Sequence, residues 1–314
     1  MVRKEVVNYI IKIFIEKINI MLIGGLTMKS PFNWVGNKYK YIGIINDLVR
    51  DKKYNDVVDC FMGSGNILLN LECTANRFIG NDKNRLLPYI YERIRVIDSF
   101  NIHQIEIILN QWNRFSSKED YYNFREYWNK KYKNNRFDSA FIYETALLLK
   151  MCSNSMVRFN SKGEFNQGFR GLGKKTEFFT DTMKKIIVNG LNDLNIELNK
   201  NNYEFFTEDI LNISPNEKDL FILDPPYILM DEMYNIDFSK KHNDYLLTLL
   251  DGNKCDFIYF NYLERDGVMY KELNDIINKN DYRVIELSNT TGTGQNRKGV
   301  KSIKEALITN IKNS

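Results

Sequence analysis

The stretch Asn55-Asp56-Val57-Val58-Asp59-Cys60-Phe61-Met62-Gly63-Ser64-Gly65 decides the fold class. Residues 55–59 predict a short strand, and the two glycines predict a turn in which the backbone can approach a ligand closely. Residues 67–73 predict a helix, and residues 77–80 predict a strand that ends at Asn81-Asp82. This order is the βαβ unit of a nucleotide-binding parallel sheet.

A long helical segment separates this unit from a second α/β segment. Residues 97–196 are rich in Tyr, Phe, Trp and Lys and lack strand–helix alternation. They predict helices at 117–131 and 139–152 and a hairpin at 159–165. Later strands are expected at 203–206, 219–223, 256–260, 282–287 and 305–310, and later helices at 241–250 and 270–278. We therefore predict an α/β fold with a Rossmann-like mixed sheet, interrupted by a mainly helical domain that carries a β-hairpin.

The expected domains follow from these changes of pattern. They are an N-terminal extension at 1–27, a first catalytic part at 28–96, a helical insertion at 97–200 and a second catalytic part at 201–314. That the extension is not native stays open as an alternative. Polar residues interrupt the apolar run at 6–26, which favours an amphipathic helix over a membrane span, and Met28 is an alternative start. We expect no membrane association and a cytoplasmic location.

The composition is that of a folded protein. Of its 314 residues, 43% are hydrophobic and 27% are charged, and the net charge of +4 is too small to indicate nucleic-acid binding by itself. Residues 158–185 hold seven basic and three acidic side chains, so this segment alone carries a charge of +4. The four cysteines form no CxxC pair, which argues against zinc and favours reduced thiols.

The glycine turn and Asp82 indicate a nucleotide-like ligand. A carboxylate at the end of the second strand suits a ribose diol, because it can accept protons from two hydroxyl groups. The dinucleotide fingerprint needs a third glycine three residues after Gly65, where this chain has Leu68, so a nicotinamide-dependent oxidoreductase is disfavoured. An ordinary tight turn with an acid at a strand end remains an alternative for these two features.

The most specific motif is Asp224-Pro225-Pro226-Tyr227, which follows the apolar residues 220–223. The prolines cannot continue a strand ladder, so they form a stiff turn that presents the Asp224 carboxylate and the Pro225 carbonyl to one space. Two acceptors of this kind would pull an adenine amino group towards tetrahedral geometry and free its lone pair for a sulfonium methyl donor. Tyr227 offers a ring on which an unstacked base can lie.

Together these motifs resemble the Dam-type DNA adenine methyltransferases, whose glycine motif, target-recognition insertion and Asp-Pro-Pro-Tyr occur in this order. The resemblance runs from about Ser30 to Asn310 and implies S-adenosylmethionine as co-substrate without a metal. It implies catalytic roles for Asp224, Pro225, Pro226 and Tyr227. It implies contacts with S-adenosylmethionine for Trp34, Lys38, Phe61, Gly63, Gly65, Asp82, Asp209 and Asp224.

The insertion resembles the part of the family that reads DNA in the major groove. The DNA-contacting residues that the resemblance implies are Asn154, Met156, Arg158, Asn166 and Arg170. Arg158 is the candidate reader of guanine, with a phosphate contact as the alternative, and Met156 could touch a thymine methyl group. The run Gln167-Gly168-Phe169-Arg170-Gly171 departs from relatives that read GATC, so GATC or a related site is only a working hypothesis.

The partners expected on this interpretation are double-stranded DNA and a cognate restriction endonuclease, with the chain itself a monomer. The basic loop at 289–301 is expected to order over the phosphate backbone or to be a plain solvated loop. Two alternatives stay open: an RNA base amino-methyltransferase, which the large insertion disfavours, and a DNA-binding protein that has lost activity, which the intact motifs disfavour.

Overall fold

The computed structural model describes residues 27–34, 36–173, 177–227, 238–287 and 303–312. The expected N-terminal extension up to residue 26 and the basic loop at 289–301 lie outside these residues. In the described part of the chain, none of the helices combines the length and the apolar character needed to cross a membrane.

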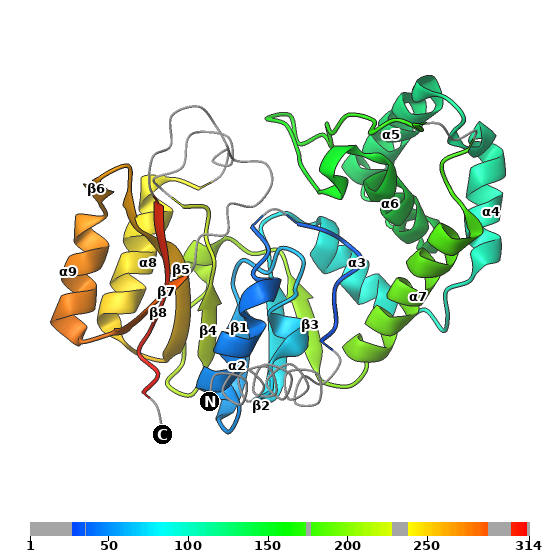
Figure 1. The fold of residues 1–314 in the computed structure, drawn as a ribbon. Coiled ribbons are helices and arrows are strands. Elements are labelled where there is room, and N and C mark those ends of the chain that lie inside the picture. Colours follow the sequence, from blue (N-terminus) through cyan, green and yellow to red (C-terminus); the bar gives the residue numbers. More distant parts are fainter. Residues whose placement is uncertain (1–26, 35, 174–176, 228–237, 288–302, 313–314) are drawn as a thin grey trace, which may run out of the picture.

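One mixed sheet of eight strands forms the centre of the molecule (Figure 1). Its order is β3-β2-β1-β4-β5-β8-β7, and β6 pairs with β5. The strands are β1 (Lys53–Asp59), β2 (Thr74–Asn81), β3 (Tyr203–Phe206), β4 (Leu220–Leu223), β5 (Asp256–Arg265), β6 (Val268–Met269), β7 (Arg283–Leu287) and β8 (Ile303–Thr309). The first five strands in this order are parallel, whereas β8 runs antiparallel between β5 and β7. The Rossmann-like mixed sheet predicted from the sequence is confirmed.

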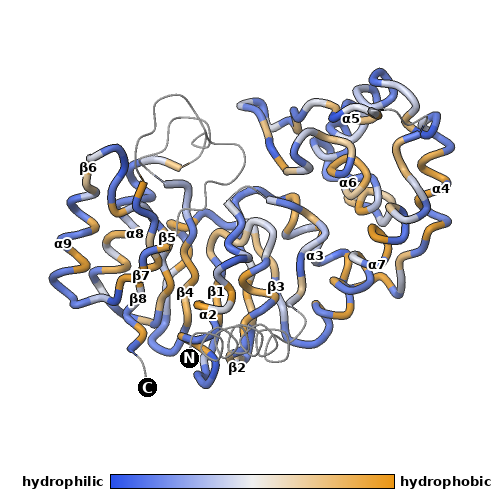
Figure 2. Tube along the Cα trace, viewed as in Figure 1, coloured by the Kyte–Doolittle hydropathy of each residue, from blue (hydrophilic) through white to orange (hydrophobic). Residues whose placement is uncertain are grey.

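Strand β4 lies between β1 and β5 in the sheet. All four of its side chains are buried, which is typical of a central parallel strand covered on both faces. Figure 2 shows the apolar residues of β4 in orange. Because β1 and β4 pair in parallel, with Asp59 next to Ile222, the loops that follow both strands leave the same edge of the sheet. This position is the switch point where ligands bind in open α/β sheets.

Residues 67–73 do not form the expected helix, and that prediction is wrong. The structure has only one 3-10 turn, η2 (Leu68–Asn70), and Leu71 is already extended. The Asn70 side chain donates to the carbonyl of Asn66 at 2.7 Å and to that of Met28 at 2.8 Å. The Asn66 carbonyl that a longer helix would use therefore bonds a side chain, and the segment is tied to the incoming N-terminal chain.

The insertion forms a helical lobe beside the β3 edge of the sheet (Figure 1). Its helices are α4 (Ile102–Gln111), α5 (Lys118–Lys133), α6 (Ser139–Met151) and α7 (Asp181–Leu198), with 3-10 turns η3 (Asn113–Phe115) and η4 (Ser153–Ser155). Helix α5, expected at 117–131, begins after a capping box between Ser117 and Asp120. Helix α7 packs against α3 (Leu86–Arg95), which links the lobe to the sheet.

Aromatic side chains fill the core of this lobe. Trp128 is fully buried and stacks on Tyr132 and Phe141 with ring centroids 5.3 and 5.1 Å apart. Its indole N–H donates to the Thr145 hydroxyl at 2.9 Å, so the ring is buried without an unpaired polar group. Phe165, from the predicted hairpin, packs edge-on against the same indole. The hairpin is thereby held on α5.

The remaining described elements are helices and 3-10 turns outside the lobe. They are η1 (Tyr39–Tyr41), α2 (Ile42–Val49), η5 (Ile210–Asn212), α8 (Lys240–Gly252) and α9 (Lys271–Asn280). Helices α8 and α9 confirm the helices expected at 241–250 and 270–278. Strand β5 runs to Arg265, five residues beyond the expected end, because its second half pairs with β8 and β6. The domain boundaries proposed above stay predictions.

Candidate active site at the carboxyl ends of the strands

The glycine loop after β1 packs tightly against Trp34. Gly63 has φ +49°, and a Cβ placed on it would lie 2.8 Å from Cδ1 of the Trp34 indole. A side chain at this position is therefore excluded by backbone conformation and by space together. Gly65 also has a positive φ, of +66°. The structure thus brings Trp34, Gly63 and Gly65 to one place, as the sequence predicts.

Asp82 closes the loop from the neighbouring strand. The Gly63 amide donates to its Oδ2 at 2.9 Å, and the Asn84 amide donates to its Oδ1 at 2.8 Å. Removal from water raises the pKa of Asp82 to about 6, while these two backbone bonds act in the opposite direction. Asp82 therefore lies directly beside the glycine loop, where a ribose diol would need it.

Asp59 is a buried carboxylate at the same edge, at the end of β1. Among the described residues, the Asp59 carboxylate accepts one hydrogen bond, which comes from the Phe61 amide at a long 3.4 Å. Burial raises its pKa well above the usual range, and the nearby Asp224 adds to this effect. A carboxylate left with so little internal pairing fits a cationic ligand at this position.

Asp224 follows β4 and is paired with Lys38, which comes from the loop before η1. The Lys38 ammonium lies 2.8 Å from Oδ1 and 2.9 Å from Oδ2 of Asp224, and it donates to the Gly36 carbonyl at 2.9 Å. Burial raises the pKa of Asp224, and the Lys38 charge opposes that rise. The lysine side chain is only 7% exposed, so water screens this pair weakly.

The turn after Asp224 places Tyr227 in contact with two carboxylates. Its hydroxyl lies 2.8 Å from Oε1 of Glu305 and 3.2 Å from Oδ1 of Asp224. Its ring meets Tyr262 edge-on with centroids 4.5 Å apart. Pro225 is buried and Pro226 is partly buried between Asp224 and this ring. Glu305 on β8 is a site residue that sequence reasoning missed, because only pairing with β5 brings it here.

A second group of polar side chains lies after β3. Asp209 accepts from the Lys83 ammonium at 2.9 Å and contacts Nε2 of His242 at 3.2 Å. Although partial burial acts the other way, the bonds from Lys83, the Leu211 amide and His242 lower the Asp209 pKa to about 2. Sequence reasoning missed Lys83 and the link to His242. The expected contact of Asp209 with a methyl donor stays a prediction, as does that of Phe61, whose ring meets Phe238 edge-on.

The expected DNA-contacting residues lie together on the helical lobe. Arg158 and Asn166 face each other across the hairpin, where the Asn166 amide donates to the Arg158 carbonyl at 3.2 Å. Both side chains are exposed, and the described part of the chain offers Arg158 no ion pair. The hairpin is confirmed by an antiparallel bridge between Phe159 and Phe165. Met156, two residues before Arg158, is partly buried.

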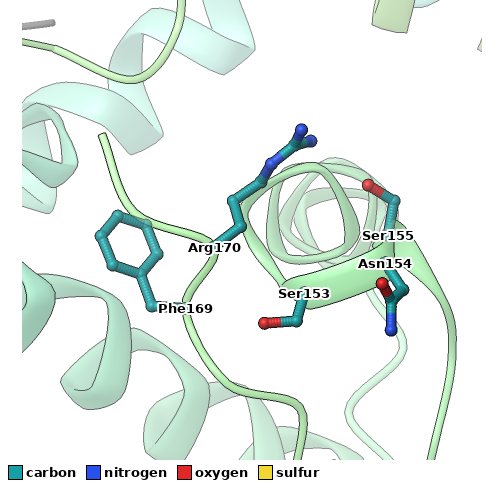
Figure 3. A pocket seen from close by; sticks show the side chains of 5 residues that line it. All are labelled: Ser153, Asn154, Ser155, Phe169 and Arg170. Carbon is teal, nitrogen blue, oxygen red and sulfur yellow. The ribbon is translucent and has the colours of Figure 1, made fainter. Parts of the chain in front are cut away.

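Asn154 and Arg170 line one surface pocket with Ser153, Ser155 and Phe169 (Figure 3). Asn154 and Ser155 have φ of +62° and +51°, a conformation that is uncommon for residues other than glycine. Figure 3 shows the Arg170 guanidinium extending away from the Phe169 ring. The segment is fixed by a bridge between Cys152 and Phe169 and by the bond from the Ser153 amide to the Gly168 carbonyl at 2.8 Å.

Residues 34–286 match a family model described as D12 class N6 adenine-specific DNA methyltransferase. The chain belongs to this family. Two curated relatives are the modification methylase StsI of Streptococcus sanguinis and the Type II methyltransferase M.FokI of Planomicrobium okeanokoites. Each is 27% identical, over 90% and 91% of this chain respectively. The DNA adenine methylase of Serratia marcescens is 27% identical over 48% of this chain and 52% of its own length.

The chain spans 43% of the length of StsI and 43% of that of M.FokI. The matched residues include the glycine loop, the insertion and the Asp-Pro-Pro-Tyr turn, and the family resemblance inferred from the sequence is confirmed. In the described residues, no three His, Cys, Asp or Glu side chains are grouped as a metal ion would require. All four cysteines are free thiols.

Proposed function

We propose that this chain transfers a methyl group from S-adenosylmethionine to the N6 amino group of adenine in a short duplex DNA site. The observation that carries the proposal is the position of Asp224. It lies at the carboxyl end of β4, beside the glycine loop of β1, and it is paired with a buried lysine. Membership of the adenine-specific family supports the same reaction.

The residues present at this edge fit the proposed methyl donor. Asp82 suits the ribose diol, and Trp34 with the glycines 63 and 65 would form the wall of its site. The carboxylates of Asp59 and Asp224 suit the positive charges of a sulfonium amino acid. When bound, S-adenosylmethionine supplies an electrophilic methyl group whose sulfur leaves with the bonding electron pair.

The protein's part in the reaction is to hold the adenine amino group. Asp224 and the Pro225 carbonyl accept its two hydrogens, which brings the nitrogen lone pair towards the methyl carbon. The Asp224 charge then stabilises the positive charge that develops on nitrogen until the nitrogen loses one proton to water. We further propose that the Tyr227 ring stacks on the base after it has turned out of the helix.

We propose that the helical lobe reads the site. Arg158 would form paired bonds with guanine, Met156 would touch a thymine methyl group, and Asn154, Asn166 and Arg170 would contact bases or phosphates. The working hypothesis for the site is GATC or a related sequence. We further propose that the chain is a cytoplasmic monomer with a cognate restriction endonuclease as its genetic partner. The names of StsI and M.FokI support such a partner.

Single-molecule sequencing of DNA from a methylation-free bacterial host that expresses this chain tests the proposal. Methylated adenine at one short motif is the expected result, and Asp224→Ala should abolish it while binding of duplex DNA survives. An unmethylated genome in cells that contain folded protein would refute DNA adenine methylation, and RNA from the same cells would then be the substrate to examine.

A further inference from the structure

Glu305 and Tyr262 are cross-strand partners, and both contact the tyrosine of the Asp-Pro-Pro-Tyr turn. Strand β8 pairs with β5 in a register that places Glu305 opposite Tyr262. The Tyr227 hydroxyl donates to Glu305 at 2.8 Å, and the Tyr227 ring meets the edge of Tyr262 at 4.5 Å. The tyrosine is thus held at its hydroxyl and at its ring by two neighbouring strands.

Glu305 also shares the buried lysine of the site. The Lys38 ammonium lies 3.6 Å from Oε1 of Glu305, compared with 2.8 Å from Oδ1 of Asp224. The side chains of Glu305 and Asp224 are each 19% exposed. One ammonium therefore faces two carboxylates, which leaves one uncompensated negative charge in a weakly hydrated place when both are ionised.

We propose that Glu305 is a positioning residue of the methyl-transfer site, which fixes Tyr227 and Lys38 relative to Asp224 before the target base arrives. This inference rests on the proposed function. The Glu305 carboxylate accepts a hydrogen bond from the Tyr227 hydroxyl. This bond fixes the plane of the Tyr227 ring, on which a flipped base can lie. Its charge draws the Lys38 ammonium to a point between the two acids.

The geometry also predicts an electrostatic consequence for Asp224. The Glu305 charge raises the Asp224 pKa, because a second carboxylate beside the same lysine disfavours the ionised form of Asp224. The other titratable groups that act on Asp224 or respond to it are Lys38, Asp59, Tyr227 and Tyr259. Replacing Glu305 with glutamine removes one contribution that raises the pKa and leaves these other groups in place.

The test compares Glu305→Leu with Glu305→Gln by single-turnover methylation, with duplex DNA prebound and S-adenosylmethionine saturating. We expect Glu305→Leu to slow the reaction roughly 10- to 100-fold, the loss that corresponds to one charge-assisted hydrogen bond. Glutamine retains an oxygen that can accept the hydrogen bond from Tyr227, so Glu305→Gln should react faster than Glu305→Leu and more slowly than the wild type. The dissociation constants of DNA and of the donor should change much less than the rate.

Two further measurements separate positioning from mere stability. In a Tyr227→Phe background the hydroxyl is already absent, so Glu305→Leu should cost clearly less than it does in the wild type. The acid limb of the Glu305→Gln rate profile should move to lower pH. Glu286→Gln, an exposed carboxylate on the adjacent strand β7, is the matched control and should leave rate and profile unchanged.

The outcomes distinguish this inference from the proposed function. If the wild-type protein methylates duplex adenine but Glu305→Leu does so equally fast, the positioning role is refuted. Equal losses in the wild-type and Tyr227→Phe backgrounds would refute it as well, and so would an acid limb that stays in place in Glu305→Gln. A wild-type protein that is folded yet inactive on DNA would instead overturn the proposed function.

Discussion

Replacing Gly63 with alanine should damage the donor site more than the fold. The residue has φ +49°, and its new Cβ would lie 2.8, 3.1 and 3.2 Å from three atoms of the Trp34 indole. The left-handed backbone costs an alanine about 1–2 kcal/mol relative to glycine. The clash adds about 1–3 kcal/mol if the indole stays, or displaces the indole if it moves.

Both consequences can be measured against a matched control. Gly267→Ala has a similar strain at φ +82° but places its Cβ where nothing lies within 4 Å. Urea unfolding should show a loss of about 1–2 kcal/mol in both variants, with a further loss only in Gly63→Ala. Calorimetric titration with S-adenosylmethionine should show at least about a tenfold weaker affinity for Gly63→Ala, because an apolar contact of this size contributes about 1.5–3 kcal/mol. Unchanged donor affinity in Gly63→Ala would refute the assignment of Trp34 and Gly63 to the donor site.

Three further predictions concern charged residues. Lys38→Met removes the cation that lowers the Asp224 pKa, so the acid limb of the single-turnover rate should move to higher pH. The control is Lys53→Met, an exposed lysine at the far end of β1, which should leave the acid limb in place. The Asp82 pKa of about 6 lies above the value of about 3.9 for an unfolded chain, so its contribution to stability falls as pH rises from about 4 to 6. Urea unfolding across this range should therefore show Asp82→Asn gaining stability relative to the wild type, and a constant difference would contradict the pKa. Arg158→Gln should reduce discrimination at one guanine by about 1–3 kcal/mol in methylation rates on substituted duplexes. Arg158 would instead be a phosphate contact if the substitution weakened DNA binding equally for all sequences. The slope of the logarithm of the binding constant against the logarithm of salt concentration would then be smaller by about 0.9.

The parts of the site that follow single strands were predictable from the sequence. The glycine loop, Asp82 and Asp224 each come directly after a strand, and parallel pairing brings such positions to one edge. The sequence predicts these positions because each site residue lies within a few residues of the strand that places it.

Contacts made by tertiary pairing were not predictable. Glu305 belongs to a closing strand whose register with β5 cannot be read from one sequence, and a shift of one residue would point it to the other face. The helix expected at 67–73 failed for a similar reason, since Asn70 bonds to Met28, 42 residues earlier in the chain. The spacing of apolar residues does not indicate a hydrogen bond from a side chain to a backbone carbonyl far away in the sequence.

The position of β8 has a consequence for the order in which the site can be assembled. The nascent chain can complete the glycine loop, the helical lobe and the Asp-Pro-Pro-Tyr turn while β8 is still unmade, because β8 begins only at Ile303. Strand β8 must then enter between β5 and β7, which are both made earlier. Until it does, the Tyr227 hydroxyl has no glutamate to bind. A chain that ended before Ile303 would therefore carry the glycine loop, the insertion and the Asp-Pro-Pro-Tyr turn without the contact between Glu305 and Tyr227.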